Sequence, residues 1–287
     1  MRILMLCGMI MLSSIVQARP NQQVPQLTPQ ASTYYHLMEK EVEHQGKQYR
    51  FFLAIPKNTP KTTLLYSVDG NAQFPLIVNE ALAQAQAKKP LPVIASLGYV
   101  GEKAYFIAER THDYTPKVHG EAFEKGGNAE QFYQFIVSQL KPYVLAQTAQ
   151  ENITITEQSL FGHSFGGVFT LYVLFNHPDA FQRYIAASPS LWWGKGEWIT
   201  QNKWQQIPNN VAVTITLGEL EETPDFSQMS EEQRLRYQTR SSWLTPRQLC
   251  DYLTDDGKTC QFYLFTGKGH GSSIPDAIKT ALEQSTE

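Results

Sequence analysis

The feature that most constrains this chain is a serine between glycines, Gly162-His163-Ser164-Phe165-Gly166, set between two apolar segments. Residues 158–161 before it form a short strand-like run, and residues 169–176 after it have the apolar character of a packed helix. A sharp strand-to-helix turn of the form Gly-x-Ser-x-Gly lifts the serine hydroxyl above the edge of a sheet. We therefore expect Ser164 to be an exposed nucleophile. The alternative is a glycine-rich turn in which Ser164 only caps the helix.

Strand-like and helix-like segments alternate along the rest of the chain. The strand-like runs are residues 34–39, 48–55, 63–68, 92–98, 184–187, 211–217 and 261–265, and the helix-like ones are 72–88, 129–147 and 274–284. The first two runs should pair as antiparallel strands. This alternation predicts an α/β fold with a mostly parallel central sheet and helices on both faces.

Three longer stretches interrupt this alternation. Residues 99–128 have little periodicity, and a loop of that length is usually functional. Residues 189–209 and 221–245 are excursions that we expect to form a small cap region. After the second excursion, Thr245 and Pro246 have the N-cap and first-turn chemistry that begins a helix.

Composition narrows the class of protein. With 287 residues, 42% of them hydrophobic, the chain can bury one large core. The net charge of −3 lacks the basic field that binding to nucleic acid requires. We expect a small-molecule partner, and the oligomeric state is left open.

The first 18 residues have the pattern of a signal peptide. Arg2 precedes an apolar run over residues 3–15, and Val16-Gln17-Ala18 matches a small-residue cleavage site. We expect cleavage after Ala18, a flexible lead-in over residues 19–32 and one domain over residues 33–287. The alternative is an uncleaved N-terminal anchor. After cleavage no apolar stretch is long enough for stable membrane insertion, so we expect export to the periplasm, or secretion.

The cysteines agree with export. Cleavage removes Cys7 and leaves Cys250 and Cys260, an even pair that predicts one disulfide in an exported protein. Two unpaired buried thiols are the alternative. We expect no metal site, because two cysteines without a nearby histidine do not complete a zinc shell and no His-x-x-x-His spacing occurs.

A serine nucleophile needs a base. His270 follows the last strand-like run in the small-residue loop Gly267-Lys268-Gly269-His270-Gly271, where a fold with the order serine, acid, histidine carries its base. His112 is the second candidate. His163 lies inside the turn and cannot easily face Ser164.

The acid that orients the base should follow the preceding strand. Glu221 lies three residues after Gly218, and we expect it to hold the imidazole. Glu219 or Glu222 could replace it, Asp225 is a weaker candidate, and a purely structural acidic turn is the alternative. The N–H of Phe165, at the positive end of the helix, is the expected oxyanion donor.

Several segments together carry a family resemblance. They are Ser67-Val68-Asp69-Gly70-Asn71-Ala72, Arg110-Thr111-His112-Asp113-Tyr114-Thr115-Pro116, Gly126-Gly127-Asn128, Phe161-Gly162-His163-Ser164-Phe165-Gly166-Gly167, Ala187-Ser188-Pro189-Ser190-Leu191-Trp192 and Gly267-Lys268-Gly269-His270-Gly271. Because these segments occur in the order that the family has, the chain resembles the esterase D group of α/β hydrolases, and within it the enterobactin-type siderophore esterases.

The resemblance implies an α/β-hydrolase fold with Ser164 as nucleophile and His270 as base. It also implies that Arg110 points into the site toward substrate; an ion pair with Asp113 or another local carboxylate is the alternative. Asn71 or Gly70 would offer the second oxyanion N–H, because their loop follows the third strand. Asp69 is expected to fix that turn.

One departure concerns the acid. The periplasmic siderophore esterases look like Ser–His dyads, whereas this chain carries Gly218-Glu219-Leu220-Glu221 after its seventh strand, as general esterases of the group do. We expect a serine carboxylic-ester hydrolase without a cofactor, acting on siderophore trilactone esters. A general acyl or feruloyl-type carboxylesterase is the first alternative, and acyl transfer or peptide hydrolysis is a further one. The alternative from a different functional class is a non-catalytic periplasmic binding protein.

Three tryptophans lie near the start of the expected cap. Trp192, Trp193 and Trp198 could form an aromatic wall for an acyl group or pack the cap onto the sheet, and we favour packing.

Overall fold

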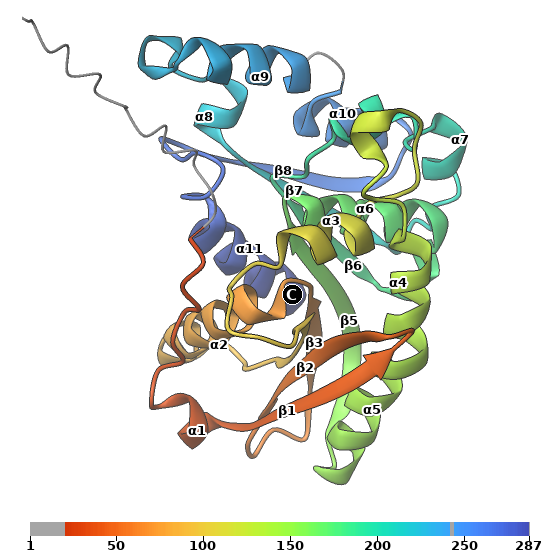
Figure 1. The fold of residues 1–287 in the computed structure, drawn as a ribbon. Helices are drawn as coiled ribbons and strands as arrows, with labels where there is room; N and C mark the ends of the chain where they lie inside the picture. The colour runs from red at the N-terminus through yellow and green to blue at the C-terminus, as the bar shows by residue number, and fades with distance from the viewer. Residues whose placement is uncertain (1–20, 242–243, 287) are drawn as a thin grey trace, which may run out of the picture.

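The computed structural model describes residues 21–241 and 244–286, so the expected signal peptide lies outside the described residues. These residues form an eight-stranded sheet in the order β1-β2-β4-β3-β5-β6-β7-β8 (Figure 1). The strands are β1 (Tyr35–His44), β2 (Lys47–Pro56), β3 (Lys61–Ser67), β4 (Val93–Tyr99), β5 (Thr154–His163), β6 (Arg183–Ala187), β7 (Ala212–Gly218) and β8 (Thr259–Phe265). Strand β2 is antiparallel to β1 and to β4, and the other neighbours are parallel. The mostly parallel sheet is therefore confirmed.

Helices cover both faces of the sheet, as expected. Helices α2 (Gly70–Gln86) and α11 (Ile274–Thr286) share one buried cluster with the sheet. The other face carries α4 (Ala129–Phe135), α5 (Lys141–Gln150), α6 (Phe165–Asn176) and α10 (Pro246–Asp255). A π-helical turn, Ile136–Leu140, joins α4 to α5 into one helical stretch. This two-sided cover gives the α/β-hydrolase arrangement.

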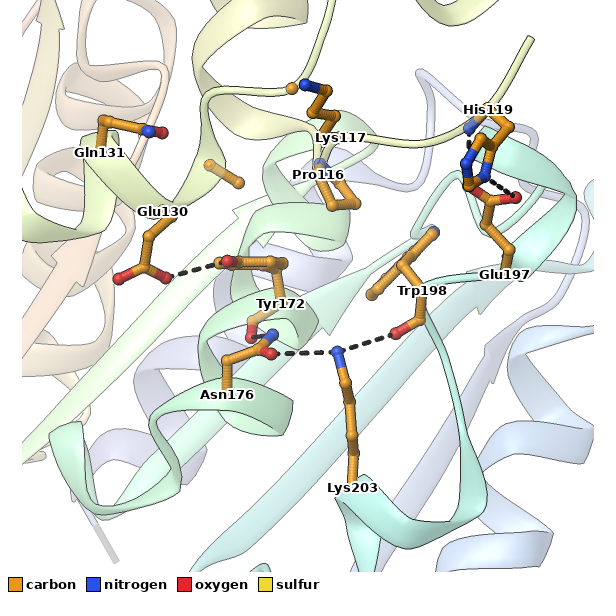
Figure 2. Close-up of a pocket in the computed structure, with 12 residues that line it drawn as sticks. Pro116, Lys117, His119, Glu130, Gln131, Tyr172, Asn176, Glu197, Trp198 and Lys203 are labelled. Atoms are coloured by element: carbon orange, nitrogen blue, oxygen red, sulfur yellow. Dashed lines mark hydrogen bonds and ion pairs between the residues drawn. The ribbon is translucent and has the colours of Figure 1, made fainter.

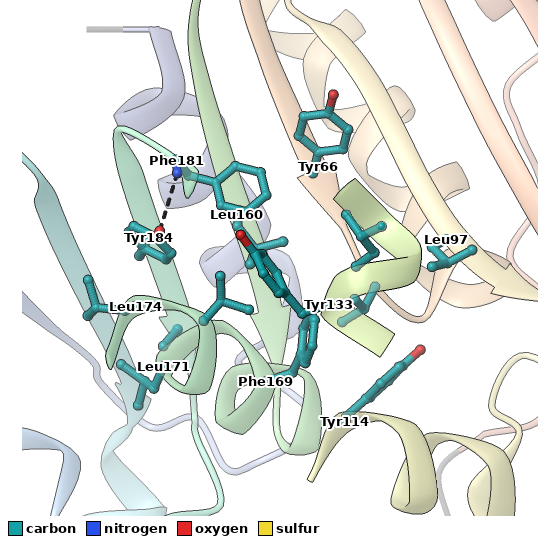
Figure 3. Close-up of a cluster of buried hydrophobic side chains, with 14 of the residues drawn as sticks. Tyr66, Leu97, Tyr114, Tyr133, Leu160, Phe169, Leu171, Leu174, Phe181 and Tyr184 are labelled. Carbon is teal, nitrogen blue, oxygen red and sulfur yellow. Dashed lines mark hydrogen bonds between the residues drawn. The ribbon is translucent and has the colours of Figure 1, made fainter. Parts of the chain in front are cut away.

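The core beneath α6 is rich in aromatic side chains (Figure 3). Phe169 of α6 packs edge-on against Phe132 of α4, and Phe181 packs edge-on against Tyr66 of β3. Each of these rings is at most 2% exposed. Burying one such side chain stabilises the folded state by roughly 1.5–3 kcal/mol. The helix that follows Ser164 is therefore firmly packed against the sheet.

The segment 99–128, which shows little periodicity in the sequence, contains regular structure. It contains α3 (Ile107–Tyr114) and a short 3₁₀ turn, Glu121–Phe123. Helix α3 buries Arg110, Asp113 and Tyr114 rather than a continuous apolar stripe. Because charged residues occupy its inner face, the usual hydrophobic period is missing from the sequence.

The lead-in before the sheet is docked from residue 22 onward. The N–H of Ala104 donates to the carbonyl of Gln22 at 3.1 Å. The N–H of Thr28 donates to Oδ1 of Asn79, in α2, at 2.9 Å. A short helix, α1 (Ala31–Tyr34), leads into β1. The domain boundaries themselves stay a prediction.

The two excursions form short elements at the carboxyl end of the sheet. The first contains a 3₁₀ turn, Trp193–Gly196, and α7 (Gln201–Trp204). The second contains α8 (Glu219–Glu222), a 3₁₀ turn, Phe226–Gln228, and α9 (Glu231–Ser241). Figure 1 shows α8 and α9 beyond the ends of β7 and β8, at the top of the view. We call α8, the second turn and α9 the cap.

Helix α10 begins as its sequence predicts. Oγ1 of Thr245 accepts the N–H of Gln248 at 3.1 Å, and Oε1 of Gln248 accepts the N–H of Thr245 at 3.0 Å. This is a capping box. One turn later, Cys250 is bonded through a disulfide to Cys260 of β8, with the two Cα atoms 5.6 Å apart. Among the described helices none is long and apolar enough to cross a membrane.

Candidate active site

Ser164 lies in a strained turn between β5 and α6. Its backbone has φ 62° and ψ −118°, a conformation that a non-glycine residue rarely adopts. A Cβ on Gly162 would collide with the main chain of Gly166, and a Cβ on Gly166 would lie 2.8 Å from the Val68 side chain. Glycine at these two positions is therefore what allows strand and helix to meet at this angle. Oγ of Ser164 lies 3.3 Å from Oγ of Ser190.

His270 and Glu221 form a close pair beside this turn. Nδ1 of His270 lies 2.6 Å from Oε2 of Glu221, and the carboxylate accepts that hydrogen bond. Because Nδ1 is engaged, Nε2 is the ring nitrogen left for a reacting group. Burial raises the pKa of Glu221, but hydrogen bonds from His270, Ser188 and Gly218 and the charge of His270 hold it below its usual range. The carboxylate therefore stays ionised and can stabilise an imidazolium.

The other acidic candidates have separate partners. Oε2 of Glu219 accepts the N–H of Gly267 at 2.7 Å, next to the His270 loop. Glu222 makes two hydrogen bonds with Arg247 of α10, at 2.7 and 2.8 Å. Asp225 caps the turn that follows it. Of the four carboxylates, Glu221 is the one that contacts His270.

Ser164 and the pair of His270 and Glu221 line one cavity, of about 620 Å³. Ser164, Glu221 and His270 line one side, and Gln233, Tyr237 and Arg240 of the cap line another. The cap thus contributes to the wall of the cavity that contains Ser164.

The oxyanion candidates lie at two helix starts. Phe165 is the first residue of α6, where a backbone N–H has no acceptor within the helix. Asn71 lies in the first turn of α2, but its side-chain amide is bonded to Tyr99: Oδ1 accepts the Tyr99 N–H and Nδ2 donates to the Tyr99 carbonyl, both at 2.9 Å. The side-chain amide of Asn71 is therefore not available to an oxyanion, and Asn71 is not among the residues that line the cavity of Ser164.

Arg110 pairs with Asp69. Its Nε and Nη2 donate to the two oxygens of Asp69 at 2.9 and 2.8 Å, and Nη2 also approaches the carbonyl of His163 at 3.4 Å. Both charged side chains are buried, and the guanidinium lies 5.5 Å from the centre of the Phe165 ring. Arg110 thus connects the loop after β3 with the turn at Ser164. Asp113, the partner considered first, instead binds Lys47, Tyr49 and Tyr99.

The other two histidines considered as a base have different surroundings. Nδ1 of His112 lies 2.9 Å from Nζ of Lys47, in a separate small cavity, so His112 is not beside Ser164. His163 is buried, and its Nε2 donates to the carbonyl of His270 at 2.9 Å. Burial and the neighbouring charges of His270 and Arg110 hold the pKa of His163 well below its usual range.

The three tryptophans divide between the two expected roles. Trp193 and Trp198 are buried, and their indole N–H groups donate to the carbonyls of Pro116 and Trp193, both at 3.0 Å. Trp192 instead lines the cavity of Ser164, with the guanidinium of Arg240 4.2 Å from the centre of its ring. Packing therefore accounts for two of the three, and the third forms a wall.

A second cavity, of about 520 Å³, lies between α4, α6 and α7 (Figure 2). Its polar side chains are largely bonded to one another: Tyr172 donates to Glu130 at 2.9 Å, and Lys203 donates to Oδ1 of Asn176 at 3.0 Å. In the part of the chain that the structure describes, no cluster of three or more His, Cys, Asp or Glu side chains could hold a metal ion.

Two serines that sequence reasoning did not single out belong to the site. Ser190 contacts the Ser164 hydroxyl, and Oγ of Ser188 donates to Oε1 of Glu221 at 2.7 Å. Both belong to the segment 187–192, which carries part of the family resemblance. That resemblance was the signal available, because neither serine has a motif of its own.

Known proteins place the chain in a family. The family model described as "Putative esterase" matches residues 43–263. The ferri-bacillibactin esterase BesA of Bacillus subtilis is 29% identical over 262 residues, which cover 83% of this chain and 85% of the relative. A siderophore enterobactin esterase of Emericella nidulans is 27% identical over 246 residues, covering 76% and 80%.

Solved structures agree on the fold. The siderophore hydrolase EstB from Aspergillus nidulans superposes with a TM-score of 0.74 at 21% identity, over 88% of this chain and 94% of that one. At this identity the likeness shows the shared fold. Together with the family match over most of the chain, it means that the chain belongs to this esterase family and is an ester hydrolase with the α/β-hydrolase fold.

Proposed function

We propose that this chain is an exported serine esterase that hydrolyses siderophore lactone esters, with Ser164, His270 and Glu221 as its catalytic residues. The observation that carries the mechanism is the 2.6 Å contact between His270 and Glu221 in the wall of the cavity that contains Ser164. The substrate class rests on the relatives, whose names give ferri-bacillibactin and enterobactin as what they act on.

The mechanism follows from these positions. Ser164 Oγ attacks the ester carbonyl while Nε2 of His270 accepts its proton, and Glu221 stabilises the imidazolium that forms. The N–H of Phe165 and a backbone N–H of residues 70–71 donate to the tetrahedral oxyanion. His270 then protonates the leaving alcohol, and water repeats the sequence to release the acid.

In this proposal Arg110 has a supporting role. Its bidentate bond to Asp69 holds the loop after β3, which carries the second oxyanion donor, against the turn that carries the first. A direct contact between Arg110 and substrate, as the resemblance implies, stays a prediction. Arg110 is not among the residues that line the cavity of Ser164.

Export is the second part of the proposal. Residues 1–18 have the signal-peptide pattern, and the bond between Cys250 and Cys260 is suited to an oxidising compartment such as the periplasm. The mature protein, isolated from the producing cell, should begin at Arg19. N-terminal sequencing of the periplasmic and cytoplasmic fractions tests this, and an intact Met1 on the mature enzyme would refute it.

Activity is tested on residues 19–287 with three esters in one mixture: a catecholate trilactone, a short aryl acyl ester and a feruloylated sugar. Mass spectrometry follows the loss of each. We expect the trilactone to open fastest, and Ser164→Ala to abolish this, while Ser32→Ala, on the surface, leaves it unchanged. Preference for the aryl or sugar ester would retain the mechanism but replace the siderophore by a general acyl or feruloyl substrate. If no ester reacts, a binding protein becomes the better reading.

A further inference from the structure

The segment between β6 and the cap contains a residue under backbone strain that directly contacts the proposed catalytic acid. Ser188 has φ 42°, although it is neither glycine nor asparagine, and Pro189 follows it. A residue before proline normally has an extended backbone, so a left-handed conformation here is unfavourable twice over. Strain of this kind is kept where the surrounding structure requires it, and it clusters at functional sites.

The surroundings of Ser188 hold this turn in place. Its N–H donates to the carbonyl of Thr216 in β7 at 2.8 Å, which extends the β6–β7 pairing by one residue. On the other side α6 approaches so closely that a Cβ on Gly167 would lie 3.0 Å from the carbonyl of Ala187 and 3.1 Å from Pro189. Ser188 is 2% exposed. The turn is therefore fixed between β7 and α6.

In this backbone conformation the hydroxyl of Ser188 points at Glu221. Oε1 of Glu221 accepts two hydrogen bonds, from Oγ of Ser188 at 2.7 Å and from the N–H of Gly218 at 3.0 Å. Because a carboxylate is planar, two hydrogen bonds to one of its oxygens fix the orientation of the whole group and so the position of the other oxygen. That other oxygen, Oε2, is the one that contacts Nδ1 of His270.

We propose that Ser188 is a positioning residue for the esterase reaction: its strained backbone aims a hydroxyl at Glu221 and so fixes the carboxylate in the orientation that His270 requires. The role rests on the proposed function, because Glu221 and His270 are its object. The same network reaches the main chain of His270, since Oγ of Ser273 lies 3.4 Å from Oγ of Ser188 and donates to the His270 carbonyl at 3.1 Å.

The acid limb of the pH–rate profile reports on this role. The Ser188 hydrogen bond helps to hold the pKa of Glu221 below its usual range, so its loss raises that pKa and makes the carboxylate a stronger partner for the imidazolium. The acid limb should therefore shift to higher pH. The charged groups nearest to Glu221 are His270, which contacts its Oε2, and Glu219 and Glu222, which lie in the same helix. Further away are Arg247, which binds Glu222, and Arg240 in the cavity wall. Lys268 and Asp276 form an ion pair around the His270 loop. Substitution of Ser188 removes none of these charged groups, so a shift of the acid limb reports on the lost hydrogen bond.

Two variants separate the hydroxyl from the strain. Ser188→Ala and Ser188→Gly both lose the hydroxyl, but only glycine adopts φ 42° without cost. We expect kcat on a neutral aryl acyl ester to fall roughly tenfold or more in both, since a hydrogen bond to a charged group is lost, with KM within about twofold. The acid limb should move upward in both, and Ser188→Gly should have the higher Tm, by about 2–4 °C. Asn152→Gly, at another positive φ of 57° remote from the cavity, is the control and should keep wild-type kinetics.

The outcomes distinguish this inference from the proposed function. If the wild-type enzyme is not labelled at Ser164 by a fluorophosphonate, the serine mechanism fails, and the role of Ser188 fails with it. If the wild type is labelled and active but Ser188→Gly keeps its kcat and pH profile, only the role of Ser188 is overturned. A loss of kcat with an unmoved acid limb also overturns it, because a merely structural residue behaves in that way. Should Ser188→Ala fail to fold, Ser188→Gly carries the test.

Discussion

At the scale of single residues, the site is built from strained backbone. Asp69 after β3, Ser164 after β5 and Ser188 after β6 all have positive φ, at 56°, 62° and 42°. These three strands are neighbours in the sheet, so the three residues lie at one edge. Each costs of order 1–3 kcal/mol, which the packed core must offset. Local stability is lost at these positions, and in return the loop at Asp69 and the hydroxyls of Ser164 and Ser188 are held in place.

The buried pair of Arg110 and Asp69 leads to a residue-scale prediction. Arg110→Met should destabilise the fold by about 3–5 kcal/mol, because it leaves the Asp69 carboxylate buried without its partner. Urea unfolding of the purified protein measures this. The double variant Arg110→Met/Asp69→Asn should recover part of the loss. A single variant of full stability with a raised KM would instead favour direct contact between Arg110 and substrate.

At the scale of elements, the cap and the β7–β8 edge carry the parts of the site that strands β3 and β5 do not. Helix α8, directly after β7, supplies Glu221, and the loop after β8 supplies His270. Glu222 binds Arg247 of α10, and its carbonyl accepts the hydroxyl of Tyr237 in α9 at 3.0 Å. Glu222 therefore joins three elements instead of acting on the histidine.

The cap should influence which esters are preferred. The guanidinium of Arg240 lies against Trp192 in the cavity wall, so it can attract an anionic aromatic acyl group. Arg240→Gln should raise KM for a catecholate ester about fivefold and change KM for a neutral aryl ester less than twofold, since a charge interaction is lost. Steady-state kinetics on both esters measures this. Arg234→Gln, on the same helix, is the matched control, and equal effects of the two variants would contradict the prediction.

The disulfide should stabilise the same edge. Replacing Cys250 and Cys260 together by serine should lower the free energy of unfolding by roughly 2–3 kcal/mol in the chain-entropy model. Guanidinium unfolding of the wild type, with and without reductant, compared with the double variant, gives the value. Reductant should leave the double variant unchanged. If reduced wild type unfolds like the oxidised protein, the bond contributes nothing measurable.

At the scale of the whole molecule, one buried histidine ties together loops that are far apart in sequence. His163 donates to the main chain of His270, and its own carbonyl approaches Arg110. These contacts link the turn after β5 with the loop after β8 and with α3. The turn of Ser164 and the loop of His270, which carry the proposed nucleophile and base, are therefore positioned by one connected set of contacts.

The same histidine makes stability depend on pH. In the folded protein the pKa of His163 is well below 6.5, so at pH values below 6.5 the unfolded chain binds a proton that the folded chain excludes. The free energy of unfolding should therefore fall as pH drops from 6.5 to 5, by up to about 1.4 kcal/mol per pH unit for this proton. Urea unfolding at several pH values measures the slope. His163→Gln keeps a donor without a titrating ring and should reduce the slope; an identical slope would exclude His163 as its source.

Much of this protein was determined by the sequence alone, because those features depend on neighbours along the chain. The strand–turn–helix unit at Ser164 follows from local sterics of glycine, and the start of α10 follows from the Thr245–Gln248 capping box. The alternation of strands and helices predicted the parallel sheet, and parallel strands bring their carboxyl ends to one edge. Ser164, Glu221 and His270 were expected together for that reason.

Only the tertiary structure decided which side chains meet at that edge. Three glutamates lie within four residues after β7, and their contacts with His270, Gly267 and Arg247 depend on segments 25 to 49 residues away in sequence. No apolar period in the sequence indicates helix α3. The packing of this helix places Arg110 against Asp69 and not against Asp113. Hydrogen bonds and ion pairs act over a few ångströms and require the chain to be packed first, so the sequence could rank the candidates for the site but could not show which contacts they make.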